Sequence, residues 1–352
     1  MWESRLGCLL VLQVFGTLSL LTYLHLVKTS GERNPETLQT RLRAKKLYAD
    51  VKSSGEWSPS MKVAVLVTTS SKMDPETLHK TLNPYRNVRA GGKWSPAGNR
   101  SSSSEKVAIL VTYKDREEHL KIFLRHMHPF LQRQGLDYAI YVIEQHGEEQ
   151  KFCKGLLYNV GFTEALKDDP TYNCFIFHDV DLIPEDVRNL YTCRKSPFHL
   201  SVAIDKFEYK LPYVTLFGGV SALTKAHYEL LNGYSNLYCG WGGEDDDMTR
   251  RMFKHKLRLS RPDKDFARYK MLAHSRNRTT DDNPARYYLL STGVSRADTD
   301  GLTDLQAANY SVTSVTHKEL YTHILVNITK RRPIKFGNPH KLNKTKIHHR
   351  RM

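Results

Sequence analysis

Apolar segments of strand length alternate with amphipathic helical segments from Lys106 onward. The run VAILVTY precedes the charged DREEHLKIFLRHMHPFLQRQ, and DYAIYVIEQ precedes LLYNVGFTEALKD. In each pair the first segment has the composition of a buried strand and the second has the pattern of a helix. NCFIFHDVDLIP and HLSVAIDKF are predicted to be further strands. Strands that alternate with helices predict an α/β sandwich with a largely parallel sheet.

The N-terminal part of the chain predicts a membrane anchor followed by a stem. Residues 6–27 carry no charge and are long enough to cross a bilayer, with Arg5 before them and Lys28 after them. We expect residues 1–5 to form a short cytoplasmic tail and the polar residues 28–104, broken by Pro, Gly and Ser, to form the stem. A cleaved signal peptide is the alternative, and both routes lead into the secretory pathway.

The formal charge of +16 is unevenly distributed. Residues 330–352 hold nine Lys or Arg side chains and no acidic one, so we interpret them as a solvated basic tail and expect no nucleic-acid partner. In the secretory pathway, N-x-[ST] sequons are candidate glycosylation sites. Here these are Asn99, Asn277, Asn309, Asn327 and Asn343.

Four cysteines lie outside the predicted anchor, namely Cys153, Cys174, Cys193 and Cys239. The secretory compartment permits disulfides, and four cysteines allow three complete pairings. None of them shows the tight doublet that is typical of a zinc site.

The strand FIFHDVDLIP ends in two acidic residues, Asp179 and Asp181. Ligands of open α/β sheets collect beyond the carboxyl ends of the strands, and alternating strand side chains would point both acids the same way. Carboxylate oxygens on a rigid element suit a divalent cation that is shared with a diphosphate. A charged loop is the alternative interpretation.

The stretch CGWGGEDDDM places four consecutive acids after a glycine-flanked tryptophan. It is compatible with a metal cage, with catalytic carboxylates, or with a charged helix start, because acids are favoured in the first turn of a helix. The glycines make Trp241 a candidate lid, and Glu244 and Asp245 are expected at a helix N-terminus. Upstream, Gly218 and Gly219 let the backbone approach a ligand closely. Downstream, Met271 and His274 have a spacing that lets both point at one ion.

Several motifs occur together between Gly91 and Tyr321: REEHL, NVGF, DVDLIP, PYV with FGGVSAL, GWGGEDDD, M-x-x-HSR and DGL. In this combination the chain resembles the β-1,4-galactosyltransferases, which are inverting enzymes with a Rossmann-like nucleotide-sugar fold called GT-A. The resemblance implies a GT-A catalytic domain at residues 105–329 of a single-pass type II Golgi membrane protein. It also implies a UDP-sugar donor and a glycan acceptor as partners.

The resemblance implies a manganese site and a donor site. Mn²⁺ would be held by Asp181, Met271 and His274, with the diphosphate completing its coordination. The thioether of Met271 is a soft ligand that chemistry alone would not select. The residues that would contact the nucleotide or the donor are Tyr113, Lys114, Arg116, Phe152, Lys154, Asp179, Val180, Lys206 and Trp241, and Trp241 would close over the donor.

On the acceptor side, the resemblance assigns Asp245 as the general base that takes the proton of the acceptor's 4-hydroxyl. Glu244 and Asp246 would grip the acceptor sugar, and the rest of the acceptor pocket would be Tyr213, Gly243, Arg286 and Tyr287. Asp247 receives no role beyond favouring the helix start. The family's catalytic-domain disulfide corresponds to Cys174 with Cys193, which leaves Cys153 and Cys239 either free or paired with each other.

Two nucleotide motifs depart from the family pattern. The family's P-F-R-N-R appears as TYKDR at residues 112–116, and its F-N-R-A appears as FCKG at residues 152–155. Lys114 and Lys154 keep the positive charge but lack the bidentate fork of arginine, so we expect differently tuned binding of uridine diphosphate.

The residue before FGG bears on which sugar is transferred. Galactose-transferring members of the family typically have Tyr there, and members that transfer N-acetylgalactosamine have an aliphatic residue. This chain has Leu216 and so resembles the second group. A smaller side chain leaves room for the donor's N-acetyl group, and a neutral packing change is the alternative interpretation. The hypothesis is a β-1,4-N-acetylgalactosaminyltransferase acting on terminal N-acetylglucosamine. The alternatives are a galactosyltransferase on the same acceptor and a glycan-binding pseudoenzyme.

Overall fold

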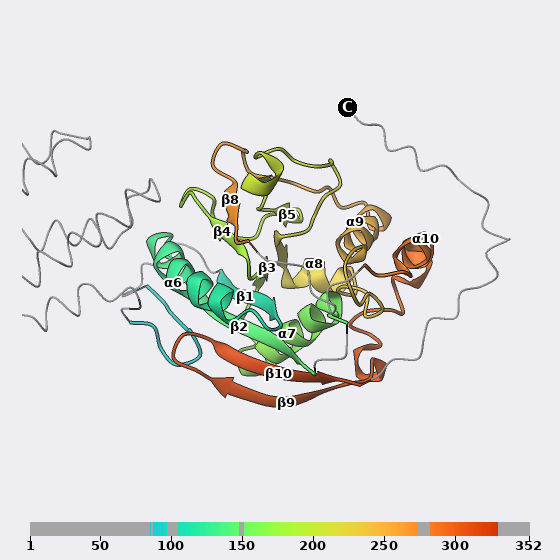
Figure 1. The fold of residues 1–352 in the computed structure, drawn as a ribbon, viewed down its shortest axis with the longest axis horizontal. Helices are drawn as coiled ribbons and strands as arrows, with labels where there is room; N and C mark the ends of the chain where they lie inside the picture. The colour runs from blue at the N-terminus through green and yellow to red at the C-terminus, as the bar shows by residue number, and fades with distance from the viewer. Residues whose placement is uncertain (1–84, 86, 97–104, 148–150, 274–281, 330–352) are drawn as a thin grey trace, which may run out of the picture. The chain divides into compact units, whose positions relative to one another are not determined.

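The computed structural model describes residues 85, 87–96, 105–147, 151–273 and 282–329. Its centre is a seven-stranded mixed sheet with the order β5-β7-β3-β1-β2-β10-β9 (Figure 1). The strands are β1 (Lys106–Tyr113), β2 (Asp137–His146), β3 (Cys174–Asp179), β5 (Phe198–His199), β7 (Val220–Thr224), β9 (Tyr310–His317) and β10 (Thr322–Ile328). The central strands β3, β1, β2 and β10 are parallel, as predicted. The edges differ from the prediction, because β7, β5 and β9 run antiparallel to their neighbours.

Two of the predicted strands are each divided between two sheets. A second, three-stranded sheet has the order β4 (Leu182–Pro184), β8 (Arg268–Met271) and β6 (Ala203–Ile204). NCFIFHDVDLIP therefore forms β3 and β4 with a turn at Val180 and Asp181, and HLSVAIDKF forms β5 and β6. The prediction that one strand carries both Asp179 and Asp181 is therefore wrong, and strand alternation no longer supports the expectation that both acids point the same way.

Helices cover both faces of the large sheet (Figure 1). Val107, Ile109 and Val111 of β1 pack with α6 (Glu117–Arg133), whereas Ala108 and Leu110 pack with α7 (Lys154–Asp168). Alternate side chains of β1 thus enter two separate cores, which explains why its sequence is a continuous apolar run. The remaining helices are α8 (Lys225–Leu230), α9 (Glu244–Lys254), α10 (Arg286–Arg296) and the 3₁₀ turns η1 (Asp205–Phe207) and η3 (Leu305–Ala307).

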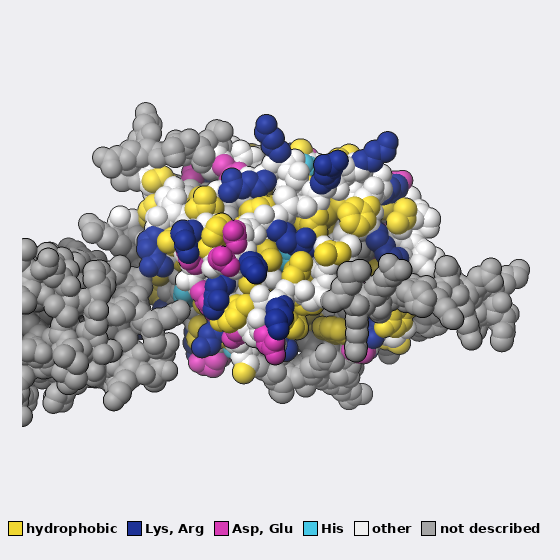
Figure 2. Space-filling view, turned by 90° about the horizontal axis from the view of Figure 1, so that it is seen from above, with side chains coloured by type: hydrophobic (Ala, Val, Ile, Leu, Met, Phe, Trp, Pro, Cys, Tyr) yellow, Lys and Arg dark blue, Asp and Glu magenta, His cyan; other side chains and the backbone are white. Residues whose placement is uncertain are grey.

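The predicted anchor and basic tail lie outside the described residues, and within those residues no helix is long and apolar enough to cross a bilayer. Part of the predicted stem contacts the domain: the backbone N–H and C=O groups of Trp94 and Tyr138 bond each other, at 2.9 Å in both directions. On the face seen from above, Lys and Arg side chains are dispersed among hydrophobic side chains (Figure 2).

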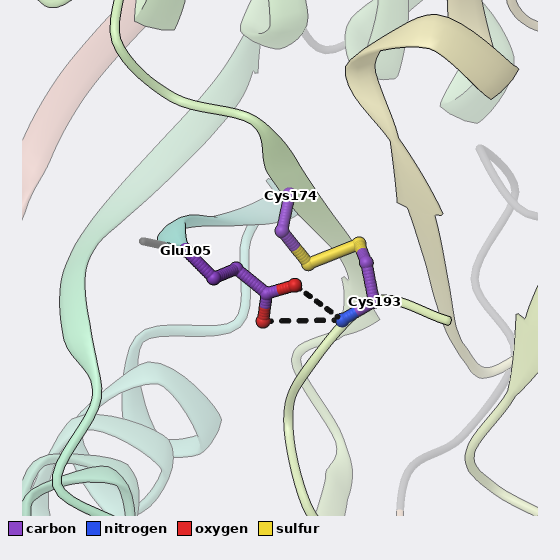
Figure 3. A group of neighbouring side chains, drawn as sticks. All are labelled: Glu105, Cys174 and Cys193. Carbon is purple, nitrogen blue, oxygen red and sulfur yellow. Dashed lines mark hydrogen bonds between the residues drawn. A yellow bond between two sulfur atoms is a disulfide. The ribbon is translucent and has the colours of Figure 1, made fainter. Parts of the chain in front are cut away.

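Two disulfides cross-link the domain. Cys174 at the start of β3 is bonded to Cys193, which confirms that pairing (Figure 3). The Glu105 carboxylate accepts a hydrogen bond from the Cys193 backbone N–H at 3.2 Å. The sulfur atoms of both cysteines in this cluster are already bonded to each other, so the cluster is a disulfide beside a carboxylate and not a metal site. Cys153 and Cys239 also form a disulfide, which decides between the two states that the sequence left open.

A buried ion pair fixes α9 to its surroundings. Arg251 and Asp247 are both fully buried, and the Arg251 Nε lies 2.8 Å from the Asp247 Oδ2. Arg251 Nη1 also donates to the backbone oxygens of Gly233 and Ala297, at 3.1 and 3.3 Å. Arg251, paired with Asp247, the last acid of EDDD, therefore anchors α9 to the segment before it and to the residue after α10.

We expect Arg251→Met to lower the free energy of unfolding by about 3–5 kcal/mol, because it leaves the Asp247 carboxylate buried without its cation. Denaturant unfolding of the purified protein measures the change. Lys254→Met is the matched control. Lys254 lies in the same helix, and its substitution removes only an exposed ion pair with Asp298, so it should change the free energy of unfolding little. Equal effects of the two substitutions would contradict the anchoring role of Arg251.

Candidate active site

The acids of EDDD occupy the first turn of α9, as predicted. Gly243 precedes them with a φ of +103°, and a Cβ at that position would lie 2.6 Å from the Cε1 of Tyr238. Only glycine fits both this backbone conformation and this contact. The N-terminal end of the helix also favours the negative charges of Glu244 and Asp245.

A single ammonium group connects the two acidic clusters of the sequence. Lys154, the first residue of α7, places its Nζ 3.1 Å from Asp179 Oδ1, 3.4 Å from Asp245 Oδ2 and 3.5 Å from Glu244 Oε1. Burial disfavours the charged form of Lys154, but the surrounding carboxylates outweigh it and raise the pKa of the ammonium well above its usual value. The end of β3 and the start of α9 therefore form one site around a permanent cation.

Asp245 is a stronger base than an ordinary aspartate. Its side chain is 21% exposed, and desolvation together with the neighbouring Glu244 and Asp179 raises its pKa to about 8, against the opposing effect of Lys154. A carboxylate with such a pKa can accept a proton from a hydroxyl group near neutral pH. The EDDD acids thus supply a candidate base, the role that the resemblance implied for Asp245.

Residues 213–218, hereafter the 213–218 segment, lie against the start of α9. The Tyr213 hydroxyl donates to Asp246 Oδ1 at 3.0 Å, and the Thr249 hydroxyl donates to the Thr215 oxygen at 3.0 Å. A Cβ at Gly218 would lie 2.4 Å from Asp245 Oδ2. The close approach predicted for this glycine is therefore made by the candidate base itself, and Leu216, which is half-buried, lies two residues away.

Trp241 and its neighbours form the exposed side of the site. The Trp241 side chain is 53% exposed, and Gly240 and Gly242 on either side have φ values of +85° and +102°. The Arg286 guanidinium lies 5.5 Å from the Trp241 ring centre and 4.9 Å from that of Tyr287. The structure thus brings together Trp241, Arg286 and Tyr287, which were predicted to contact donor and acceptor.

Two of the predicted manganese ligands are neighbours. β4 pairs with β8, so that Leu182 lies opposite Met271. The backbone N–H of Leu272 donates to the backbone oxygen of Asp181 at 2.8 Å. Asp181 and Met271 are both half-buried, and the hard carboxylate oxygen of Asp181 suits a divalent cation. Asp181 thus fits a manganese site by its donor chemistry and Met271 by its position beside Asp181, while His274 lies outside the described residues.

The predicted nucleotide contacts are spread along the carboxyl edge of the sheet. Tyr113 and Asp179 end the parallel strands β1 and β3, and the buried Val180 follows in the turn. Lys114 is buried and donates to the Gly147 oxygen, so its ammonium already has a backbone partner. The other predicted contacts are Arg116 before α6, the half-buried Phe152, which packs against one core, and the exposed Lys206 on η1.

Comparison with known proteins identifies the family. The profile of the N-terminal region of glycosyl transferase group 7 matches residues 38–194, and that of the N-terminal domain of galactosyltransferase matches residues 198–275. Beta-1,4-galactosyltransferase 2 of Cricetulus griseus is 43% identical over 270 residues, which cover 77% of this chain and 71% of that protein. The chain belongs to the β-1,4-galactosyltransferase family. It is therefore a glycosyltransferase, as predicted.

Other members of the β-1,4-galactosyltransferase family support the same assignment. Human beta-1,4-galactosyltransferase 1 is 44% identical over 273 residues, covering 78% of this chain and 66% of that protein. The catalytic domain of Drosophila beta1,4galactosyltransferase 7 in complex with xylobiose superimposes with a TM-score of 0.54 at 27% identity, covering 65% of this chain and 95% of that one. A mutant of the Drosophila enzyme is in complex with manganese, UDP-Gal and xylobiose. These structures confirm the mixed-sheet, GT-A-like α/β fold.

Two features of this galactosyltransferase-family site were missed by sequence reasoning, the carboxylate contacts of Lys154 and the ion pair of Asp247, and a third, the Cys153–Cys239 disulfide, was left open. The disulfide joins the residue before Lys154 to Cys239, the first residue of the segment 239–243, hereafter the Trp241 loop. In this loop the Gly240 N–H also donates to the Phe152 backbone oxygen at 2.8 Å. One signal was present in the sequence, because each cysteine lies next to a predicted donor-binding segment.

We expect Gly218→Ala to lower kcat by about 100-fold, because the new methyl group would displace the Asp245 carboxylate from its position. The Gly218 backbone has an ordinary φ, so the fold should tolerate alanine. Steady-state kinetics and thermal unfolding measure the two effects separately. Unchanged kcat, or a collapse of stability that accounts for the loss, would show that the Gly218–Asp245 contact does not control the base.

We expect the double substitution Cys153→Ala, Cys239→Ala to raise the KM for the sugar donor several-fold, because the Trp241 loop loses its covalent tie to α7. The stability loss should be about 2–4 kcal/mol. The matched control, Cys174→Ala with Cys193→Ala, removes a disulfide that joins other elements and should lower stability without raising KM. Parallel KM changes in both variants would refute a specific link to the loop.

Proposed function

We propose that this glycosyltransferase moves N-acetylgalactosamine from UDP-GalNAc, in β-1,4 linkage, to terminal N-acetylglucosamine of glycoprotein or glycolipid glycans. The observation that carries the proposal is the 213–218 segment, which places Leu216 two residues from the glycine that abuts the candidate base. Leu216 offers a donor sugar more room than a tyrosine would and removes a polar partner.

The reaction is a single displacement with inversion. Asp245 takes the proton of the acceptor's 4-hydroxyl while that oxygen forms a bond to the anomeric carbon of the donor, and the bond from this carbon to the diphosphate oxygen breaks. Glu244 and Asp246 would bind the acceptor sugar beside the base, and Trp241 would exclude water from the donor. When bound, Mn²⁺ supplies positive charge to the departing diphosphate, and Asp181 and Met271, together with His274, would hold it.

A second candidate function is transfer of galactose from UDP-galactose to the same acceptor. It is favoured by the relatives, which are named as galactosyltransferases, and by the Drosophila enzyme in complex with UDP-Gal. A glycan-binding pseudoenzyme is less well supported, because Asp179, Glu244 and Asp245 converge around Lys154 as an intact charged site.

We further propose that the protein is a single-pass type II protein of the Golgi membrane, anchored by residues 6–27. Two disulfides support an oxidising compartment. Of the predicted glycosylation sites, Asn309 and Asn327 are exposed, which suits a glycan, whereas Asn99, Asn277 and Asn343 lie outside the described residues.

The decisive assay compares UDP-GalNAc with UDP-galactose on an N-acetylglucosamine acceptor in the presence of Mn²⁺. We expect the wild type to prefer UDP-GalNAc, and Leu216→Tyr to shift the ratio of kcat/KM values toward galactose by about 10- to 200-fold. Val214→Tyr, at a 79% exposed position of the same segment, is the matched control and should leave the ratio unchanged. A wild type that prefers galactose would overturn the donor assignment.

The pH dependence of kcat/KM tests the base. Protonation of Asp245 in the free enzyme should abolish transfer as the pH falls through about 8. Lys154→Met removes a charge that lowers the pKa of Asp245, so this acidic limb should move to higher pH, whereas Lys154→Arg keeps the charge and should leave it in place. The charged and titratable groups around Asp245 are Lys154, Glu244, Asp246, Asp179, Tyr158, Tyr213 and Tyr234. An acidic limb that does not move in Lys154→Met would argue against Asp245 as the titrating base.

A further inference from the structure

Arg261 binds the backbone of the 213–218 segment. Its Nη2 donates to the oxygens of Val214 and Leu216, both at 2.8 Å. Among the described residues no carboxylate forms an ion pair with Arg261, and burial lowers the pKa of its guanidinium. Burying a cation is costly unless it is hydrogen-bonded, and the bonds that offset this cost for Arg261 all go to the backbone of this segment and to His199.

His199 extends the contact from Arg261 to Gly218. Arg261 Nε donates to His199 Nδ1 at 3.2 Å, and His199 Nε2 lies 2.9 Å from the Gly218 oxygen. A carbonyl oxygen only accepts hydrogen bonds, so Nε2 carries the proton and Nδ1 is the acceptor. Burial, and then the charge of Arg261, lower the pKa of His199 to about 3, which keeps the imidazole neutral and in this tautomer.

Ser201 completes the set of contacts on the same carbonyl. Its hydroxyl donates to the Gly218 oxygen at 3.1 Å and accepts from the Val220 N–H at 2.8 Å. His199 and Ser201 are fully buried on the β5–β6 stretch, so the Gly218 carbonyl is bound from a rigid part of the fold. Arg261 and His199 thus bind the carbonyls of residues 214, 216 and 218, while Thr249 of α9 binds that of residue 215.

We propose that Arg261, acting directly and through His199, is a positioning residue that sets the discrimination between donor sugars. It fixes the backbone on both sides of Leu216, so the position of that side chain depends on the guanidinium and not only on the residue type. It also fixes Gly218 against the Asp245 carboxylate. The inference rests on the proposed function insofar as the 213–218 segment is taken to meet the donor sugar.

The test compares Arg261→Lys with the matched control Arg258→Lys. A lysine keeps the charge but cannot reach two carbonyls and an imidazole together, whereas Arg258 is exposed and makes no described contact with the segment. The first readout is hydrogen–deuterium exchange of the amides of residues 213–220, and the second is the ratio of kcat/KM for UDP-GalNAc and UDP-galactose. Both use the full-length enzyme with Mn²⁺.

In Arg261→Lys we expect faster exchange confined to residues 213–220 and a donor ratio that moves toward one by about fivefold, the factor expected for one lost hydrogen bond. His199→Gln should act in the same direction, and Arg258→Lys should change neither readout. Faster exchange with an unchanged donor ratio, or no change in either readout, would overturn the proposal.

The outcome also separates this inference from the proposed function. A wild type that transfers from neither donor would refute the proposed function alone. The ratio of dissociation constants of the two UDP-sugars, measured by calorimetry, would then replace the kinetic ratio. An unchanged ratio of dissociation constants in Arg261→Lys would overturn the positioning role of Arg261.

Discussion

The buried ammonium of Lys154 is the contact on which the arrangement of the site depends. It lies within 3.5 Å of carboxylate oxygens of Asp179, Glu244 and Asp245, which come from the end of β3 and the start of α9. Three carboxylates in a poorly hydrated space repel one another, and a shared cation offsets that repulsion. The same cation lowers the pKa of Asp245, while burial raises it, so the base keeps a pKa close to working pH.

The elements that carry these charges are each held by contacts outside the chemistry. α9 is anchored by the Asp247–Arg251 pair, and the start of α7 is tied to the Trp241 loop by the Cys153–Cys239 disulfide. The 213–218 segment is held by hydrogen bonds from Thr249 and from Arg261. The carboxylates of the site are therefore held by contacts that do not depend on the position of the Trp241 side chain.

Sequence patterns predicted the elements whose periodicity is local. β1, α6, β2 and α7 follow from alternating apolar strands and amphipathic helices, and the run of acids correctly predicted the start of α9. The divided strands β3/β4 and β5/β6 were missed, because apolar residues continue past the point of division in each segment and only the pairing partners show where the sheet changes.

Contacts between distant segments could not be predicted in the same way. Lys154 was expected at the nucleotide because its motif resembles the family's, whereas its carboxylate partners depend on where α7 and α9 begin in space. The Cys153–Cys239 bond needed the distance between two loops, and Asp247 was indistinguishable by sequence from the acids beside it. Residue identity predicted which groups take part, and the packing decides which of them meet.

The most direct measurement is a structure of the Asp245→Asn variant with Mn²⁺, a UDP-sugar and an N-acetylglucosamine acceptor. In this account the acceptor is assigned to the acids that begin α9 and the metal to Asp181. We therefore expect the acceptor's 4-hydroxyl to lie against the side chain at position 245, with the metal on Asp181 and Met271 across the donor sugar. A metal bound by Glu244 and Asp246, or an acceptor hydroxyl directed away from position 245, would contradict this division.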